Sequence, residues 1–208
     1  MLNKPYSESC EQNKQPILNV ISQLFTNPNS TVLEIGSGTG QHAAYLPKYL
    51  PHLTWQPSDT EQNIPGIESW RNSVKLDNVL ATKILDVTQN QWPIEPTDYI
   101  FSANTLHIMP WHAVEAMFKG IRSALKPNGL FCVYGPFNYN GKFTSASNAQ
   151  FELWLKSRNP ESGIRDFEAL CELGNNESSN SQLKLKLKLI QDHPMPANNR
   201  ILVFQSHT

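Results

Sequence analysis

One short segment, TVLEIGSGTGQHAAYLP at positions 31–47, limits the folds open to this chain more than any other. It places three glycines within five positions, Gly36, Gly38 and Gly40, directly after a run of strand-forming residues. Glycine removes the side chain where the backbone turns sharply or a ligand must come close. A helical pattern begins near Gly40, and the free N–H groups of its first turn would face the loop. The segment therefore predicts a strand, a binding turn and a helix in succession.

The rest of the chain continues this alternation of strands and helices. Strand and helix patterns take turns along the sequence, over residues 53–59, 64–76, 79–87, 98–104, 111–125 and 129–135. Such alternation predicts a parallel sheet with helices on both faces. The chain ends on two consecutive strand patterns, 183–190 and 199–205, which predict an antiparallel hairpin at one edge. The expected fold class is α/β, a three-layer, doubly wound, Rossmann-like sheet of seven strands, mostly parallel, with a C-terminal antiparallel hairpin.

The length of 208 residues suits one ordinary domain, so we expect a single domain over 1–208. Apolar residues at helical spacing between Gln15 and Phe25 predict an N-terminal helix with Pro16 in its first turn. We expect residues 1–27 to form a helical cover and residues 136–175 to form a lid on the substrate side.

Two classes of ligand use a strand, a glycine loop and a helix in this way. Nucleotide pyrophosphates favour the spacing GxGxxG. S-adenosylmethionine, which carries a carboxylate and no phosphate, is typically bound by a tighter GxGxG loop that follows an acid. Here the loop is GSGTG, with Ser37 inside it and Glu34 two residues before Gly36. The spacing favours S-adenosylmethionine, and the alternative is a turn that only packs a helix on a strand.

Two aspartates end the next two predicted strands. Ligands of open α/β sheets bind beyond the carboxyl ends of the strands. We expect Asp59 to accept hydrogen bonds from ribose hydroxyls, Asp86 to accept from the adenine amino group, and Val87 to lie against the ring. Either aspartate alone could be a turn residue, and a site for NAD would carry the ribose acid too. His42 would orient the loop or face solvent.

The net charge and the cysteine content limit the partners and the cellular location that we expect for this chain. The net charge of −1 offers no field that would attract nucleic acid or an anionic membrane. No apolar run approaches the roughly 20 residues of a membrane span, and the N-terminus lacks the pattern of a signal peptide. The three cysteines are too dispersed for a disulfide framework or a zinc site, so we expect no metal and a reducing, cytoplasmic location. Nothing in the sequence specifies an oligomeric state.

Together these segments resemble class I S-adenosylmethionine-dependent methyltransferases, which finish their sheet with such a hairpin. More narrowly, the chain is similar to a small methyltransferase-like family that is also labelled a domain of unknown function. The combinations HIMPW (107–111), YGPF (134–137) and MPANN (195–199) carry this narrower resemblance, and matching segments span nearly the whole chain. The resemblance implies the seven-stranded sheet and S-adenosylmethionine as the cofactor.

The chain departs from the family pattern at a few positions. Gln12 stands where the family usually has an arginine, so anchoring of the cofactor by the N-terminal segment would rest on Asn13 or Lys14. Gly36 replaces the usual alanine, which is closer to the general methyltransferase pattern. Ser162 stands where an aromatic residue is common, which predicts looser packing of its loop.

Methyl transfer from a sulfonium is an in-line displacement, so the protein must mainly align the acceptor and exclude water. The segment SANTLHIMPW (102–111) should lie near the sulfur. Asn104 would contact the methionine part of the cofactor, His107 would act as a base, and Trp111 would line the acceptor site. A buried histidine bonded to the backbone, and a tryptophan that packs at a helix start, are the alternatives.

Two further segments offer candidates for the acceptor site. VYGPFNYN (133–140) supplies Tyr134 as a second catalytic candidate and Asn138 and Tyr139 as substrate-binding residues. In the closing hairpin, Asn198 and Asn199 would either bind substrate or complete the turn.

The leading hypothesis is an S-adenosylmethionine-dependent methyltransferase that acts on a small-molecule acceptor, without nucleic-acid or membrane partners. A second hypothesis is a sensor or interaction protein that binds S-adenosylmethionine or S-adenosylhomocysteine without catalysis. An NAD(P)-binding oxidoreductase is the third, and the GxGxG spacing counts against it.

Overall fold

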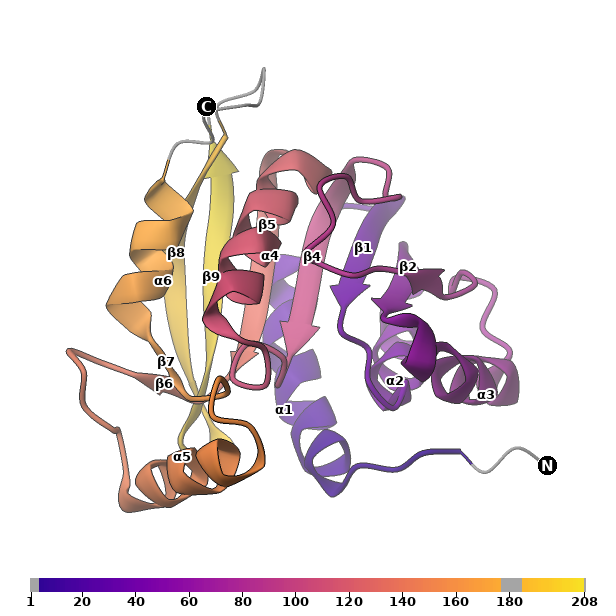
Figure 1. Ribbon diagram of the computed structural model, residues 1–208. Helices are drawn as coiled ribbons and strands as arrows, with labels where there is room; N and C mark the ends of the chain where they lie inside the picture. Colours follow the sequence, from indigo (N-terminus) through magenta and orange to yellow (C-terminus); the bar gives the residue numbers. More distant parts are fainter. Residues whose placement is uncertain (1–3, 177–184, 208) are drawn as a thin grey trace.

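The computed structural model describes residues 4–176 and 185–207 (Figure 1). One seven-stranded sheet has the order β3-β2-β1-β4-β5-β9-β8. Its strands are β1 Ser30–Ile35, β2 Leu53–Asp59, β3 Lys83–Ile84, β4 Thr97–Ala103, β5 Leu125–Gly135, β8 Lys186–Met195 and β9 Asn199–His207. The first five pair in parallel, whereas β9 is antiparallel to both β5 and β8. The predicted fold class is confirmed.

Helices cover both faces of this sheet (Figure 1). They are α1 Glu8–Leu24, α2 Gln41–Tyr49, α3 Ile64–Val74, α4 Trp111–Ala124, α5 Ala146–Arg158 and α6 Phe167–Asn175, with short 3-10 turns η1 Glu61–Asn63 and η2 Pro196–Asn198. Two short strands, β6 Phe137–Asn138 and β7 Arg165–Asp166, pair with each other outside the main sheet. None of the helices in the described ranges is long and apolar enough to cross a membrane.

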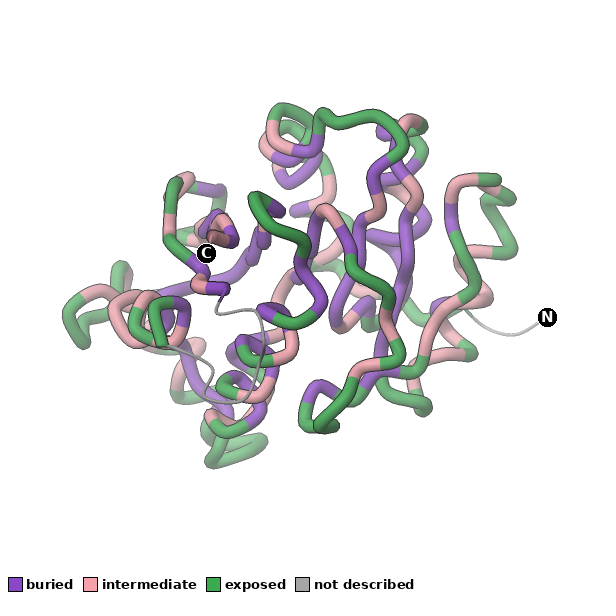
Figure 2. Tube along the Cα trace, turned by 90° about the horizontal axis from the view of Figure 1, so that it is seen from above, coloured by how far each residue is buried: buried purple, intermediate pink, exposed green. Residues whose placement is uncertain are grey.

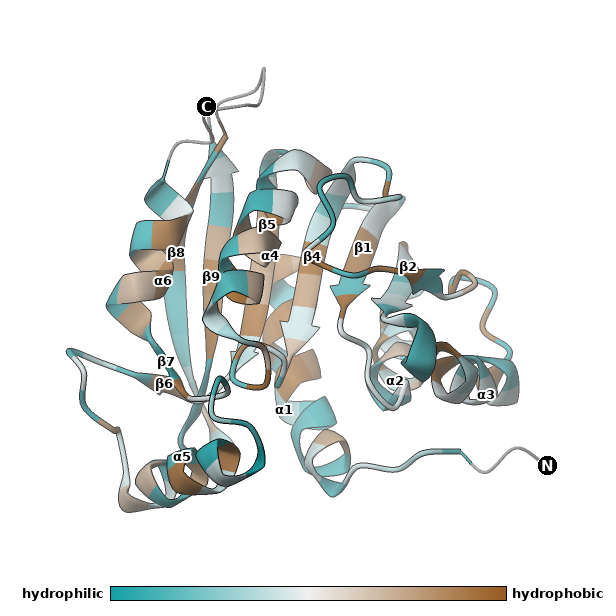
Figure 3. Cartoon of the chain, viewed as in Figure 1, coloured by the Kyte–Doolittle hydropathy of each residue, from teal (hydrophilic) through white to brown (hydrophobic). Residues whose placement is uncertain are grey.

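Two clusters of buried side chains fill the spaces on either side of the sheet. Val32 and Leu33 are neighbours in β1 but belong to opposite clusters, because successive side chains of a strand point to opposite faces. The cluster with Leu33 contains the apolar face of α4, and the cluster with Val32 contains those of α1 and α2. Figure 2 shows the buried trace running through the centre, and Figure 3 shows hydrophobic residues along the inner strands. The three-layer arrangement follows from this packing.

Three boundaries differ from the sequence-based expectation. The first helix begins at Glu8, capped by the side chain of Ser7, so Pro16 lies inside the helix and not in its first turn. The strand expected over 79–87 pairs only at Lys83–Ile84 and through one isolated bridge at Val79, and the chain turns after Asp86. The helix after the glycines continues through Pro47 to Tyr49.

The closing hairpin forms as expected, but its first strand extends beyond 190 to Met195. The register with β9 shifts between Leu189 and Gln191, so Ile190 has no paired residue in β9. Residues 183 and 184 of the predicted strand lie outside the described residues. The turn that joins β8 to β9 is η2.

Candidate functional site

The glycines of the loop between β1 and α2 have different roles, because one allows helices to pack together and another leaves room for a ligand. All three glycines have positive φ, +72° at Gly36, +56° at Gly38 and +88° at Gly40. A Cβ on Gly40 would lie 2.7 Å from the Cα of Ile67, so this glycine allows α2 to pack against α3. A Cβ on Gly38 would meet nothing closer than 4.0 Å. Gly38 is therefore the member of the loop that leaves room for a ligand.

Asp59, at the end of β2, holds the loop in place. Its Oδ2 accepts a hydrogen bond from Gly38 N at 2.7 Å. Its Oδ1 accepts from Thr60 N at 2.7 Å and from Asn63 Nδ2 at 2.9 Å. A carboxylate has about four lone-pair sites, so Oδ2 retains capacity for one further donor. The carboxylate is thus both a support of the loop and a partly free acceptor.

A cavity of about 910 Å³ opens at the carboxyl ends of β1, β2, β4 and β5. It brings together ten of the residues expected at the site, namely Asn13, Gly36, Ser37, Gly38, His42, Asp59, Asn104, His107, Tyr134 and Asn199. These residues come from α1, the glycine loop, α2, the ends of β2 and β5, the β4–α4 loop and the closing hairpin. Residues separated by most of the chain therefore share one cavity at the strand ends.

Glu34 lies beneath the loop and not in the cavity. Its carboxylate is 2% exposed and accepts a hydrogen bond from Trp55 Nε1 at 2.7 Å. Burial raises the pKa of Glu34 to about 7, although the bond from Trp55 opposes this. The acid that precedes the glycines therefore couples β1 to β2 and supports the loop from below. Gly40, for the reason given above, is likewise a packing residue.

The two residues expected at the adenine ring do not line the cavity. Asp86 is exposed, and its Oδ1 accepts from Thr88 N at 2.9 Å and from Thr88 Oγ1 at 2.7 Å. These bonds lower the pKa of Asp86. Val87 is buried in the cluster that contains the apolar face of α4. In this structure both residues form the turn that ends β3.

Four residues expected to bind substrate also lie outside the cavity lining. Trp111 begins α4 and donates from Nε1 to Glu115. Tyr139 stacks on Phe167 and donates its hydroxyl to Asp192 Oδ2 at 2.8 Å. The buried Oδ1 of Asn138 has no hydrogen-bond partner among residues 4–176 and 185–207.

Asn198, the fourth, lies in η2 and donates to Ser147, which does line the cavity. It therefore reaches the site only through a neighbour.

A buried polar pair joins the N-terminal helix to the loop side of the cavity. His42 Nε2 and Asn13 Oδ1 are 2.7 Å apart, and both side chains are buried. Burial lowers the pKa of His42 to about 4, with a smaller contribution from Lys14. His42 is therefore neutral at pH 7 and faces the cavity, so the alternative of a solvent-exposed histidine is wrong.

His107 is a buried base with unused hydrogen-bonding capacity. Its ring is 6% exposed and meets Phe151 edge-on at 5.3 Å between centroids. Within the described residues neither ring nitrogen has a hydrogen-bond partner. Burial, and secondly the charge of Arg165, lower the pKa of His107 to about 4. Burial raises the pKa of Tyr134 to about 12, so at pH 7 the imidazole is free to accept a proton and the phenol keeps its own.

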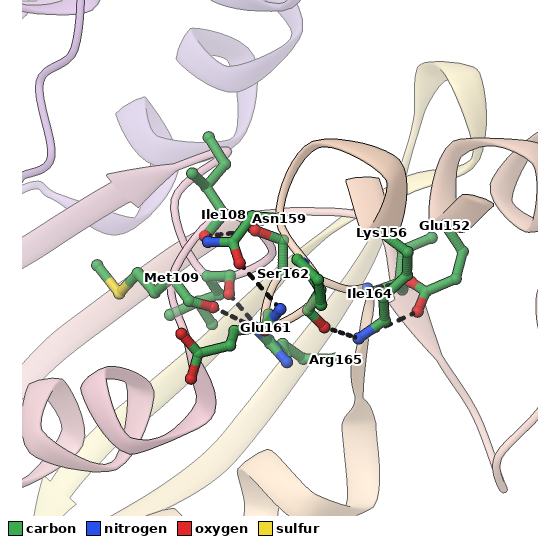
Figure 4. A network of polar contacts seen from close by, with 11 residues as sticks. Ile108, Met109, Glu152, Lys156, Asn159, Glu161, Ser162, Ile164 and Arg165 are labelled. Atoms are coloured by element: carbon green, nitrogen blue, oxygen red, sulfur yellow. Dashed lines mark hydrogen bonds and ion pairs between the residues drawn. The ribbon is translucent and has the colours of Figure 1, made fainter. Parts of the chain in front are cut away.

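Backbone and side-chain groups of the segment 159–165 hold the loop that carries His107 (Figure 4). Gly163 N donates to His107 O at 2.9 Å, and Ser162 Oγ donates to Ile108 O at 2.7 Å. Arg165 donates to the carbonyls of Leu106, Met109 and Glu161. Ser162 is buried by these contacts, so the expected looser packing around it is not observed. The position of His107 thus depends on a network that is remote in sequence.

Of the cavity-lining residues that two helices contribute, sequence reasoning named only Asn13. The cavity is also lined by residues of the N-terminal segment and of α5, namely Ser7, Ser9, Cys10, Gln12, Pro16, Ser147, Asn148, Phe151, Trp154 and Leu155. Apolar spacing predicted the N-terminal helix, but no motif distinguished the face of either helix that meets the ligand. In the described part of the chain, no group of histidine, cysteine or acidic residues could hold a metal ion.

The fold is that of S-adenosylmethionine-dependent methyltransferases. The mitomycin 7-O-methyltransferase MmcR is 17% identical with a TM-score of 0.75, covering 95% of this chain and 54% of that one. The S-adenosylmethionine-dependent methyltransferase SibL is 16% identical with a TM-score of 0.71, covering 96% and 56%. This chain belongs to the family described as "Protein of unknown function (DUF938)", which matches residues 4–206.

Among curated proteins, a non-reducing polyketide synthase of Penicillium rubens is 27% identical over 124 residues, which are 57% of this chain and 5% of the synthase. The chain thus spans a small part of that relative and just over half the length of the two similar structures.

Proposed function

We propose that this protein is an S-adenosylmethionine-dependent methyltransferase that acts on a small-molecule acceptor. The observation that carries the proposal is one cavity that joins the glycine loop and Asp59 to a histidine with free ring nitrogens. Its volume of about 910 Å³ lies near the upper end of the range of about 300–1,000 Å³ for small-molecule sites. A cavity of this size has room for a nucleoside cofactor beside a second small molecule.

The residues around the glycine loop suit the cofactor. Gly38 leaves its Cβ position open, so the ribose can approach the backbone, and Oδ2 of Asp59 has a lone pair left for a hydroxyl. Asn13 and Asn104 would contact the methionine part from α1 and from the end of β4. The assignment of Asp86 to the adenine amino group stays a prediction, since its carboxylate already accepts two bonds from Thr88.

When bound, S-adenosylmethionine would supply a methyl group whose bond to sulfur breaks with both electrons going to sulfur, while an acceptor lone pair forms the new bond to carbon. His107 would take the proton that leaves the acceptor and release it to water. A protonated ether is a far stronger acid than an imidazolium of pKa about 4, so even this weakened base suffices. Tyr134 is too weak an acid to become a base near pH 7 and would only donate a hydrogen bond.

Topology distinguishes this proposal from a dinucleotide oxidoreductase. The usual dinucleotide-binding sheet runs 3-2-1-4-5-6 in strand order, whereas here the last strand of the chain, β9, lies antiparallel between β5 and β8. The free ring nitrogens of His107 favour catalysis over simple binding, because a pure sensor has no need of an unpaired base in its cavity.

Calorimetric titration with S-adenosylmethionine, S-adenosylhomocysteine and NADH tests the cofactor. We expect both adenosyl compounds to bind and Asp59→Ala to weaken them about 10- to 150-fold, the value of a hydrogen bond to a charged group. Asp77→Ala, an exposed aspartate outside the cavity, should bind like the wild type. Binding of NADH alone would overturn the proposal.

Catalysis is tested with methyl-labelled cofactor and a metabolite extract, by following transfer of the label. His107→Gln should lower the rate by about 10²- to 10⁴-fold, as expected for loss of a general base, with affinity for S-adenosylhomocysteine unchanged. His112→Gln, on the exposed face of α4, is the control. An adenosyl-binding protein that transfers no label from any extract would support the sensor hypothesis.

A further inference from the structure

The geometry points to an uncharged aromatic compound with a hydroxyl group as the methyl acceptor, held against α5 with its hydroxyl at His107. This inference rests on the proposed function, since it names the substrate of the same cavity. It concerns the part of the cavity that lies beyond His107, away from the glycine loop. In Figure 1, α5 and α2 lie on opposite sides of α1, and both helices contribute to the cavity lining. We call the part lined by α5 and its neighbours the α5 half.

Apolar and aromatic side chains dominate the α5 half. Its lining includes Ile108, Met109, Pro136, Phe151, Trp154, Leu155 and Pro196. The rings of Phe151 and Trp154 stack with centroids 5.6 Å apart and planes 17° apart. Trp154 is 48% exposed and Ile108 is 58% exposed, so apolar surface stands uncovered at the cavity. A planar aromatic ligand would cover it and gain stacking energy that an aliphatic ligand of the same size would not.

The α5 half offers no charge to a ligand. Of the described side chains that line the cavity, only Asp59 carries a formal charge, and it lies at the end of β2, on the loop side. Two arginines that contact lining residues of this half are occupied elsewhere. Arg165 donates to backbone carbonyls, and Arg158 packs on the Trp154 ring without lining the cavity. A carboxylate or ammonium on the acceptor would lose hydration without gaining a partner, which is costly.

Two amides and the imidazole of the α5 half present unused hydrogen-bond acceptors, beside the Ser147 hydroxyl, which already accepts from Asn198 and bonds to Ser145. Asn148 donates its amide N–H groups to Thr144 Oγ1 and Asn198 O. Asn199 donates its amide N–H groups to Pro196 O and Ala197 O. Their carbonyl oxygens take no hydrogen bond from the described residues, and the one ring nitrogen of neutral His107 that carries no proton is also a free acceptor. Such a site needs a ligand that brings a donor, and a hydroxyl is an uncharged donor that also has a lone pair to methylate.

Four ligands of similar size separate these requirements. 2-Naphthol has the ring, the hydroxyl and no charge. 2-Naphthoate adds a charge, 2-methoxynaphthalene lacks the donor, and decahydro-2-naphthol lacks the planar ring. Each is titrated by calorimetry into the protein saturated with S-adenosylhomocysteine, so that the readout is binding and not turnover. We expect 2-naphthol to bind at least tenfold more tightly than the other three.

Equal or tighter binding of 2-naphthoate, of 2-methoxynaphthalene or of decahydro-2-naphthol would overturn the inference. Binding of none of the four, with S-adenosylhomocysteine bound, would overturn it too and leave the proposed function standing. Failure of S-adenosylhomocysteine itself to bind would instead remove the proposed function. With S-adenosylmethionine in place, mass spectrometry should detect 2-methoxynaphthalene formed from 2-naphthol.

Two neighbouring residues of α5 provide a matched pair of variants. Trp154 lines the cavity, whereas Leu153 is 72% exposed and does not. Both are exposed enough for alanine to leave the fold intact. Trp154→Ala should weaken 2-naphthol binding about tenfold, since stacking on an aromatic ring is lost, and Leu153→Ala should leave it unchanged. Equal affinities in the two variants would remove α5 from the acceptor site.

Discussion

The two halves of the cavity are built by different means. The loop half consists of backbone at the ends of adjacent parallel strands, where Gly38 donates to Asp59 across the gap between β1 and β2. The α5 half is carried by a helix that buries only Asn148 and Leu155 and lies outside the main sheet. Its link to the rest of the site is a set of side-chain bonds to carbonyls, many of them from Arg165.

This difference suggests how the two ligands are treated. The cofactor always has the same structure, so it suits the loop half, whose strand ends cannot shift without disturbing the core. An acceptor suits a half made of a peripheral helix and loops, where substitutions change shape at little cost to the fold. We therefore expect substitutions in the loop half to reduce stability and cofactor binding together. Substitutions in the α5 half should weaken acceptor binding and leave cofactor binding unchanged.

The largest effect is expected at Gly40. Alanine there must adopt a positive φ, at a cost of about 1–2 kcal/mol, and its Cβ would collide with the backbone of Ile67. Overpacking of this kind costs about 1–3 kcal/mol more. Gly40→Ala should therefore lower the free energy of unfolding by about 2–5 kcal/mol in urea denaturation, with loss of S-adenosylhomocysteine binding.

Gly141 is the control for this variant. It has φ +68°, and a Cβ added to it would have no atom within 4 Å, so Gly141→Ala isolates the backbone strain from the collision. Its cost should stay at about 1–2 kcal/mol. If both variants were equally stable, the close approach of α2 and α3 would not be what the third glycine permits.

Arg165 tests the α5 half in the same way. Arg165→Met keeps the aliphatic stem but removes the donors to three carbonyls, and each such hydrogen bond contributes about 0.5–1.5 kcal/mol net. We expect a loss of about 2–4 kcal/mol in unfolding free energy, a higher KM for the acceptor and an unchanged Kd for S-adenosylhomocysteine. Arg71→Met breaks only a surface pair with Glu68 and should cost less than about 1 kcal/mol. Weaker cofactor binding in Arg165→Met would show that the two halves are coupled.

The sequence predicted the loop half better because its geometry follows from secondary structure. Once β1 and β2 are parallel neighbours, Gly38 and Asp59 must end at the same edge of the sheet, whatever the side chains around them do. The same reasoning placed Asn104, His107 and Tyr134 at the cavity, since they follow β4 or end β5. What local pattern could not show was that Glu34 points into the core toward Trp55 and that Asp86 bonds to its own turn.

The sequence did not predict the α5 half, because its segments are joined by single hydrogen bonds between residues far apart in the sequence. The spacing of Ser162 and Arg165 does not indicate that they bond to a loop more than fifty residues earlier. The spacing of Glu152 does not indicate that it accepts a hydrogen bond from Ile164 N. Tyr139 illustrates the converse error. It follows β5 as a substrate-binding residue should, yet β6 turns it toward Phe167 and Asp192. Register predicts the ends of strands, whereas the path of a long connection depends on contacts that no periodic pattern encodes.

The smallest of the three effects is expected at Glu34 and depends on pH. Burial raises the pKa of Glu34 to about 7 in the folded protein, from 4.5 for an ordinary glutamate. The folded state therefore holds a proton that the unfolded state releases, and stability is lost as pH rises from about 4.5 through 7. Glu34→Gln removes this titration while its amide oxygen still accepts from Trp55. Measured by urea denaturation, the variant should gain roughly 2–3 kcal/mol on the wild type between pH 5 and pH 8.

Glu115 supplies the matched control, because it too accepts a hydrogen bond from a tryptophan indole, that of Trp111, but is exposed. Glu115→Gln should differ from the wild type by the same amount at both pH values. Affinity for S-adenosylhomocysteine decides what Glu34 contributes to the site. If Glu34→Gln binds as tightly as the wild type, the acid acts on the fold beneath the loop, as its bond to Trp55 indicates. A tenfold loss of affinity without loss of stability would show that the charge of Glu34 contributes directly to cofactor binding. In that case Glu34 could no longer be described as a structural acid distinct from Asp59, the binding acid.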